Sequence, residues 1–77
     1  MEAKSKAVRS MLRSMAPSKA VPFIRSFDLP EDEAQALILC DCRRESLVEV
    51  AMDSCCSVDT VADRRRRALA KIADALE

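Results

Sequence analysis

The sequence predicts an all-α protein, a small bundle of about five helices. The 77 residues include no glycine and only two aromatic side chains, so the chain lacks the turn and strand residues of a small β fold. Alanine, leucine, arginine, glutamate and methionine, which favour helices, recur at helical spacing. A chain of this length forms one domain with a modest core, since only about 60% of its unfolded surface is buried on folding.

The first predicted helix is basic and amphipathic and spans residues 3–15. Its apolar stripe consists of Ala7, Val8, Met11, Leu12 and Met15, and its other faces carry Lys4, Lys6, Arg9 and Arg13. Two interpretations stay open: the stripe packs on the domain, or the basic side lies on phosphates or docks on a partner. Pro17 and its polar neighbours are expected to end the helix in a loop. Residues 1–20 are therefore predicted as a basic helix and loop, and residues 21–77 as the main domain.

Two further helices are expected in the middle of the chain. Phe23, Ile24 and Phe27 lie at helical spacing in a short helix over residues 21–27, where the aromatic rings anchor the core. Leu29-Pro30-Glu31 is a helix-start pattern, because proline is tolerated in the first turn and acidic residues favour a helix N-terminus. The helix it opens is predicted over residues 30–43, and its inward residues are Ala34, Leu37, Ile38 and Cys42.

The last two predicted helices are joined by a tight turn. Ser46 is expected to cap a helix over residues 47–54, and Ser57 a helix from Val58 to about Ala75. The buried face of the last helix is Val58, Val61, Ala68, Leu69, Ile72 and Leu76, and it also carries four consecutive arginines, Arg64 to Arg67. Such a pair is either a helix-turn-helix or an ordinary helical hairpin with a solvated arginine face.

Charge is segregated along the chain although the formal net charge is zero. Residues 1–27 carry +5, residues 28–63 carry −8 and residues 64–77 carry +3. The two basic ends can present a positive surface if they adjoin, whereas the acidic middle weakens long-range attraction to DNA.

The sequence gives no sign of export, a metal centre or catalysis. There is no apolar run of the kind found in a signal peptide or a membrane span, so we expect a cytoplasmic protein with no membrane partner and with reduced cysteines. A zinc site built from Cys40, Cys42, Cys55 and Cys56 is disfavoured by their spacing, and residues 40 and 42 of a helix point about 200° apart. We expect no cofactor. Without histidine or a glycine loop, an enzymatic function is not expected.

From Phe23 to Leu76 the sequence resembles region 4 of bacterial sigma factors, the domain that recognises the promoter −35 element. The resemblance is carried by Leu29-Pro30-Glu31, Leu37-Ile38-Leu39 with Asp41, Ser46 with Glu49-Val50-Ala51, Ser57-Val58 with Thr60-Val61, Arg67-Ala68-Leu69 and Lys71-Ile72. The family usually has glycine where this chain has Arg44 and Cys55, and a buried leucine where it has Glu45 and Ser54. A left-handed residue other than glycine costs on the order of 1 kcal/mol, so a divergent member with a looser turn is expected.

The resemblance implies a DNA-binding transcription regulator whose last helix enters the major groove of double-stranded DNA. The expected contact residues are Ser46, Ser57, Asp59, Thr60, Asp63, Arg64, Arg66 and Arg67. Arg64 is the expected guanine reader, Arg66 and Arg67 meet phosphates, and Arg65 lays its stem on the core with its head in solvent. Ser46 and Ser57 bind phosphates together with the backbone N–H groups of their helix starts. Thr60 contacts a thymine methyl or a phosphate. Asp59 and Asp63 accept a hydrogen bond from cytosine or only favour the helix N-terminus.

An alternative function is a protein-interaction module with the same fold that binds RNA polymerase or a partner regulator without reading DNA. The neutral charge and the two aspartates of the last helix favour this alternative, and its arginines favour DNA. A homodimer is compatible with both functions.

Overall fold

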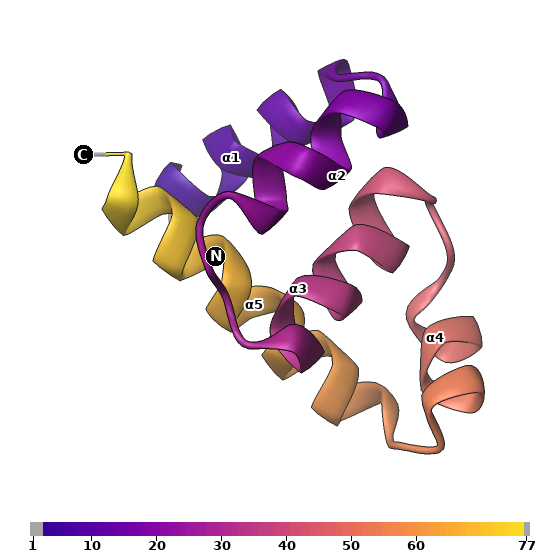
Figure 1. The fold of residues 1–77 in the computed structure, drawn as a ribbon. Coiled ribbons are helices and arrows are strands. Elements are labelled where there is room, and N and C mark those ends of the chain that lie inside the picture. The colour runs from indigo at the N-terminus through magenta and orange to yellow at the C-terminus, as the bar shows by residue number, and fades with distance from the viewer. Residues whose placement is uncertain (1–2, 77) are drawn as a thin grey trace.

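A computed structural model describes residues 3–76, which form five α-helices and one π-helical turn and contain no strand (Figure 1). This confirms the all-α class. Residues 1, 2 and 77, the outer ends of the predicted segments 1–20 and 21–77, lie outside the described residues. The elements are α1 (Ala3–Ser14), α2 (Pro17–Arg25), α3 (Glu31–Leu37), the π-helical turn η1 (Ile38–Cys42), α4 (Leu47–Ser54) and α5 (Val58–Ala75).

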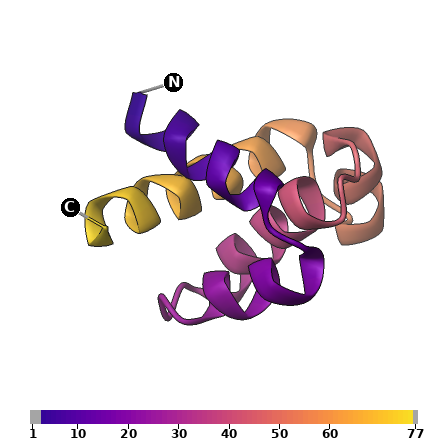
Figure 2. The ribbon, with the colours of Figure 1, turned by 90° about the horizontal axis from the view of Figure 1, so that it is seen from above.

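The long helix α5 is the element on which α1, α3 and α4 pack. The larger core cluster joins Val8 and Leu12 of α1 to Leu69 and Ile72 in the C-terminal half of α5, and it also contains Leu37 of α3. Figure 2 shows α1 lying across that half of α5. The two basic ends of the chain therefore adjoin, as a joint positive surface requires.

A second, smaller core cluster fixes α4 to the N-terminal half of α5. It consists of Ala36, Cys40, Val50, Ala51 and Val61. Cys40 belongs to this cluster, whereas Cys42 belongs to the larger one. The two thiols thus lie on opposite sides of η1, as their helical spacing predicts, and both are buried.

The predicted loop after the first helix is wrong, because residues 17–20 belong to α2. Pro17 begins this helix instead of separating two others, and proline suits the first helical position since its missing N–H has no intrahelical partner there. Pro22 lies inside the same helix. The aromatic pair behaves as predicted: Phe23 and Phe27 pack against the core, with ring centroids 5.0 Å apart in an edge-to-face arrangement.

The helix predicted over residues 30–43 changes its winding at Ile38. The Arg43 N–H donates to the Ile38 carbonyl, which is the i to i+5 bond of a π-helical turn. This turn buries three consecutive residues, Cys40, Asp41 and Cys42. The predicted inward residues Ala34, Leu37, Ile38 and Cys42 are all buried, whereas burial of the charged Asp41 was not expected.

The last two helices begin where their caps were predicted, but the buried face of α5 is shorter than expected. Val61, Ala68, Leu69 and Ile72 are buried, whereas Val58 and Leu76 at the two ends are 38% and 51% exposed. Val58 is the first residue of α5 and Leu76 follows its last, so the buried face is confined to the interior of the helix. Among the described residues, no helix combines the length and the apolar character needed to cross a bilayer.

Candidate nucleic-acid interface

The connection between α4 and α5 consists of Cys55, Cys56 and Ser57 and is held by backbone hydrogen bonds. Cys55 adopts a left-handed conformation with φ of 56°, and the Cys56 N–H donates to the Ala51 carbonyl over 3.0 Å. This is the pattern that ends helices at a left-handed residue, most often glycine. Cys55 thus takes the backbone geometry that glycine favours, and the expectation of a looser turn is wrong, because the helix end closes with its regular hydrogen bond.

Both predicted caps are formed. Ser46 accepts from the Glu49 N–H, and the Glu49 carboxylate accepts in return from the Ser46 N–H, which makes a capping box at the start of α4. Ser57 accepts from the Thr60 N–H over 3.1 Å, and the two hydroxyls lie 2.8 Å apart. The first turn of α5 therefore presents a bonded pair, Ser57 and Thr60, while Ser46 lies at the opposite end of α4.

The face of α5 that points away from the core carries equal numbers of acidic and basic side chains. It includes Asp59, Asp63, Arg66 and Arg67, of which the two arginines are 69% and 64% exposed. Asp63 forms ion pairs with both of them, with Arg66 in very close contact and with Arg67 over 3.0 Å. This face is therefore electrically balanced rather than positive.

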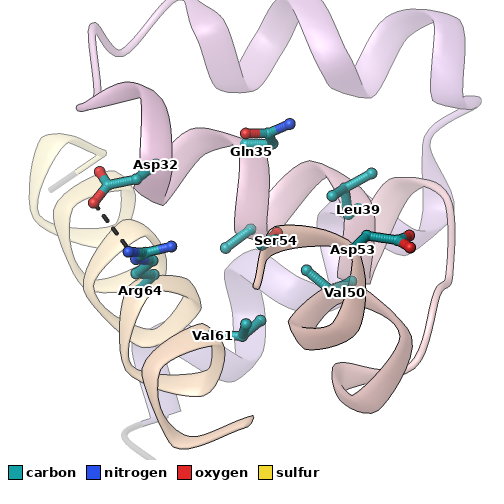
Figure 3. A pocket seen from close by; sticks show the side chains of 9 residues that line it. Asp32, Gln35, Leu39, Val50, Asp53, Ser54, Val61 and Arg64 are labelled. Carbon is teal, nitrogen blue, oxygen red and sulfur yellow. Dashed lines mark ion pairs between the residues drawn. The ribbon is translucent and has the colours of Figure 1, made fainter. Parts of the chain in front are cut away.

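Arg64, the predicted guanine reader, points along the molecule toward α3 instead of outward. Its Nε lies 3.5 Å from an Asp32 carboxylate oxygen, and its Nη1 donates weakly to the Cys56 sulfur over 3.8 Å. Figure 3 shows the Arg64 side chain reaching Asp32 across the space between the two helices. To reach a base edge, Arg64 must leave both partners.

Arg65 is structural, but its head lies in the protein and not in solvent as predicted. Its Nε and Nη2 donate to the two carboxylate oxygens of Asp41 over 2.8 and 2.9 Å. The Asp41 side chain is completely buried, and the hydrogen bond to Asp41 raises the pKa of Arg65. Because a buried carboxylate needs a partner charge, this two-point contact ties η1 to α5. Each arginine of the run thus pairs with an aspartate of the same chain.

Asp41 also faces two arginines of α1 that were not among the predicted site residues. Arg9 and Arg13 place their Nε atoms 3.7 and 3.5 Å from the same Asp41 oxygen. Beside them, the Arg44 guanidinium donates weakly to the Arg13 carbonyl over 3.5 Å. One sequence signal was available, because Lys6, Arg9 and Arg13 follow each other at spacings of three and four residues, which is one face of a helix.

A pocket of about 340 Å³ lies between α3, α4 and α5, close to Arg64 (Figure 3). Its apolar walls are Ala36, Leu39, Val50 and Val61, and its polar rim is Asp32, Gln35, Asp53, Ser54 and Arg64. Ser54, the last residue of α4, lines this pocket, and so do Arg64 and its partner Asp32.

The cysteines are free thiols in distinct environments. Cys40 and Cys42 are buried, and burial raises the pKa of both thiols, whereas Cys55 is exposed in the turn. Within the described residues no three histidine, cysteine or acidic side chains are placed to hold a metal ion together.

Comparison of the chain with protein-family models, with curated proteins and with solved structures finds no significant match.

Proposed function

We propose that the chain is a DNA-binding transcription regulator in which α4, the turn and α5 form a helix-turn-helix of the sigma region 4 type. The observation that carries this proposal is the construction of the α4–α5 unit. Both helices start at serine caps, a three-residue turn with a left-handed Cys55 joins them, and the long helix keeps one full face exposed. A helix presented in this way fits the width of the DNA major groove.

The balanced face of α5 is compatible with DNA because its ion pairs are exposed and weak. An exposed pair contributes about 0–1 kcal/mol, so Arg66 and Arg67 can exchange Asp63 for phosphates at little cost. The pair between Arg64 and Asp32 is partly exposed, at 34% and 54% of the two side chains, and Arg64 can exchange it for the two acceptors of a guanine. The buried contact between Arg65 and Asp41 stays in place.

The remaining site residues have short-range roles in this proposal. Ser57 and Thr60, already bonded to each other, lie at the groove-entering end of α5, where Thr60 meets a thymine methyl or a phosphate. Ser46, at the N-terminus of α4, contacts a phosphate of the DNA backbone together with the free N–H groups of that helix end. Asp59 and Asp63 accept a hydrogen bond from the N4 amino group of a cytosine that faces them in the groove, and they disfavour other bases at that position.

The proposal is tested by selecting duplexes from a random pool and then titrating the enriched duplex at several salt concentrations. We expect an enriched motif and a log–log salt slope near −0.9 for each phosphate neutralised. Arg64→Ala should relax the sequence preference by about 1–3 kcal/mol, whereas Arg66→Ala should weaken all sequences alike. Absence of binding at low salt, or binding independent of salt, contradicts the proposal.

A second candidate function, a module that binds RNA polymerase or a partner regulator without reading DNA, is favoured by one specific observation. Val48 and Met52, one turn apart on α4, are 56% and 74% exposed. Apolar side chains that are exposed together are typical of protein contacts rather than phosphate contacts. Retention of purified polymerase by the chain after nuclease treatment, without enrichment of any duplex, would favour this second function.

A further inference from the structure

Besides the arginine run of α5, basic side chains also gather on α1 and in the loop after η1. We define the basic stripe as Lys6, Arg9, Arg13 and Arg44. The three α1 residues share one face of that helix, which carries no acidic residue in its first turn, and Arg44 reaches its C-terminal end by donating to the Arg13 carbonyl. We propose that the basic stripe binds the phosphodiester backbone of duplex DNA and is the main phosphate contact of the chain.

The charge balance around Asp41 supports this inference. This one buried carboxylate faces Arg9, Arg13 and Arg65, and it already accepts two short hydrogen bonds from Arg65. Arg13 has only a 3.5 Å contact to a shared oxygen and is 51% exposed, so most of its N–H donors face solvent. The charge of Asp41 is already offset by Arg65, so Arg13 adds a positive charge at the surface, whereas Asp59 and Asp63 together offset Arg66 and Arg67 on the outer face of α5.

The backbone at Arg44 is left-handed, as it also is at Asp28 and Cys55 in this chain without glycine. Arg44 has a φ of 56°, a left-handed conformation that costs a residue with a Cβ on the order of 1 kcal/mol relative to glycine. The guanidinium of Arg44 lies at the end of α1, where it donates to the Arg13 carbonyl. A glycine would relieve the strain but would remove the cation.

Nucleic acid suits this surface better than a membrane does. The branched apolar side chains of α1, Val8 and Leu12, are 3% and 1% exposed, so they pack in the core and are not free to enter a bilayer. Three of the four cations are arginines, whose planar guanidinium groups bind phosphate oxygens in pairs. A basic stripe along one helix is also the usual electrostatic footprint of nucleic-acid binding.

The inference rests on the proposed function, and the variants Lys6→Ala and Arg44→Gly test it. Neither residue belongs to the core, and Arg44→Gly should leave the fold intact or make it more stable. Each variant should lower duplex affinity at 0.1 M salt on the order of five- to tenfold and reduce the log–log salt slope by about 0.9. Lys19→Ala on α2 is the matched control, since it removes one exposed positive charge outside the stripe and should leave the slope unchanged.

The outcomes separate the inference from the function it rests on. Unchanged binding by both stripe variants, or an equal loss in Lys19→Ala, overturns the basic stripe and leaves DNA binding by α5 standing. Loss in the stripe variants with no effect of Arg64→Ala or Arg66→Ala supports the stripe and overturns recognition by α5. No duplex binding by the unaltered chain at low salt overturns both. Stripe-dependent binding to vesicles that contain anionic lipid, without stripe-dependent binding to DNA, overturns the choice of nucleic acid.

Discussion

Asp41 shows how one residue determines the role of its neighbours. Its fully buried carboxylate holds Arg65 by two hydrogen bonds and draws Arg9 and Arg13 to the same place. A buried charge of this kind is tolerated because its partners are charged and its oxygens are hydrogen-bonded. Arg65 is thereby removed from any contact with a ligand, although it stands inside a run of four arginines.

Loss of the Asp41 carboxylate should destabilise the protein strongly. Asp41→Ala leaves the half-buried guanidinium of Arg65 without a counter-charge, and breaking a buried pair in this way costs on the order of 3 kcal/mol. Urea unfolding of the variant measures this loss. The control is Asp63→Ala, which breaks two exposed pairs and should change the free energy of unfolding by less than about 1 kcal/mol. Equal effects of the two variants would show that Asp41 is not a structural centre.

How far a residue lies in sequence from its hydrogen-bond or ion-pair partner explains which parts of the site can be predicted from the sequence. The caps Ser46 and Ser57 are correct because a cap depends on residues three positions away in the same chain. The directions of Arg64 and Arg65 were not predictable, because Asp32 and Asp41 lie 32 and 24 residues away in sequence and meet α5 only after folding. The same holds for Arg44 and Arg13, 31 positions apart.

At the scale of the elements, local signals predict most helices, but not the start of α2 or the winding of η1. The bounds of α4 and α5 follow from their caps and their apolar spacing. Pro17 is ambiguous by itself, because proline both ends one helix and begins the next. The π-helical turn η1 buries Cys40 in one core cluster and Cys42 in the other, and these contacts with distant helices are not contained in a local sequence pattern.

A glycine in place of Cys55, in the turn between α4 and α5, should stabilise the protein. Cys55 is exposed and left-handed, so Cys55→Gly removes the clash of its Cβ without losing buried contacts, and we expect a gain of about 1 kcal/mol in the free energy of unfolding. Cys55→Ala keeps the Cβ and should give no such gain. Thermal or urea unfolding of the two variants measures the difference, and an equal stability for both would mean that backbone strain at this position is negligible.

At the scale of the whole molecule, α1 is part of the core rather than an appended arm. The interpretation in which its apolar stripe packs on the domain is correct for Val8 and Leu12, while Ala7 is exposed and Met11 and Met15 are only partly covered. Packing and ligand contact are not exclusive here, because the buried side of α1 faces α5 and its basic side stays accessible. Two interpretations that the sequence left open can therefore hold together.

Because α1 and α5 share one core, weakening α1 should destabilise the whole fold in a single step. Leu12 is 1% exposed and packs with Leu69 and Ile72, so Leu12→Ala should cost about 2–5 kcal/mol, a large share of the stability of a domain this small. Met11→Ala, one position away on the partly covered side, should cost much less. Amide hydrogen exchange measures the effect: in Leu12→Ala, protection should fall equally in α1 and in the C-terminal half of α5. Loss of protection confined to α1 would mean that this helix folds and opens independently of the remaining helices.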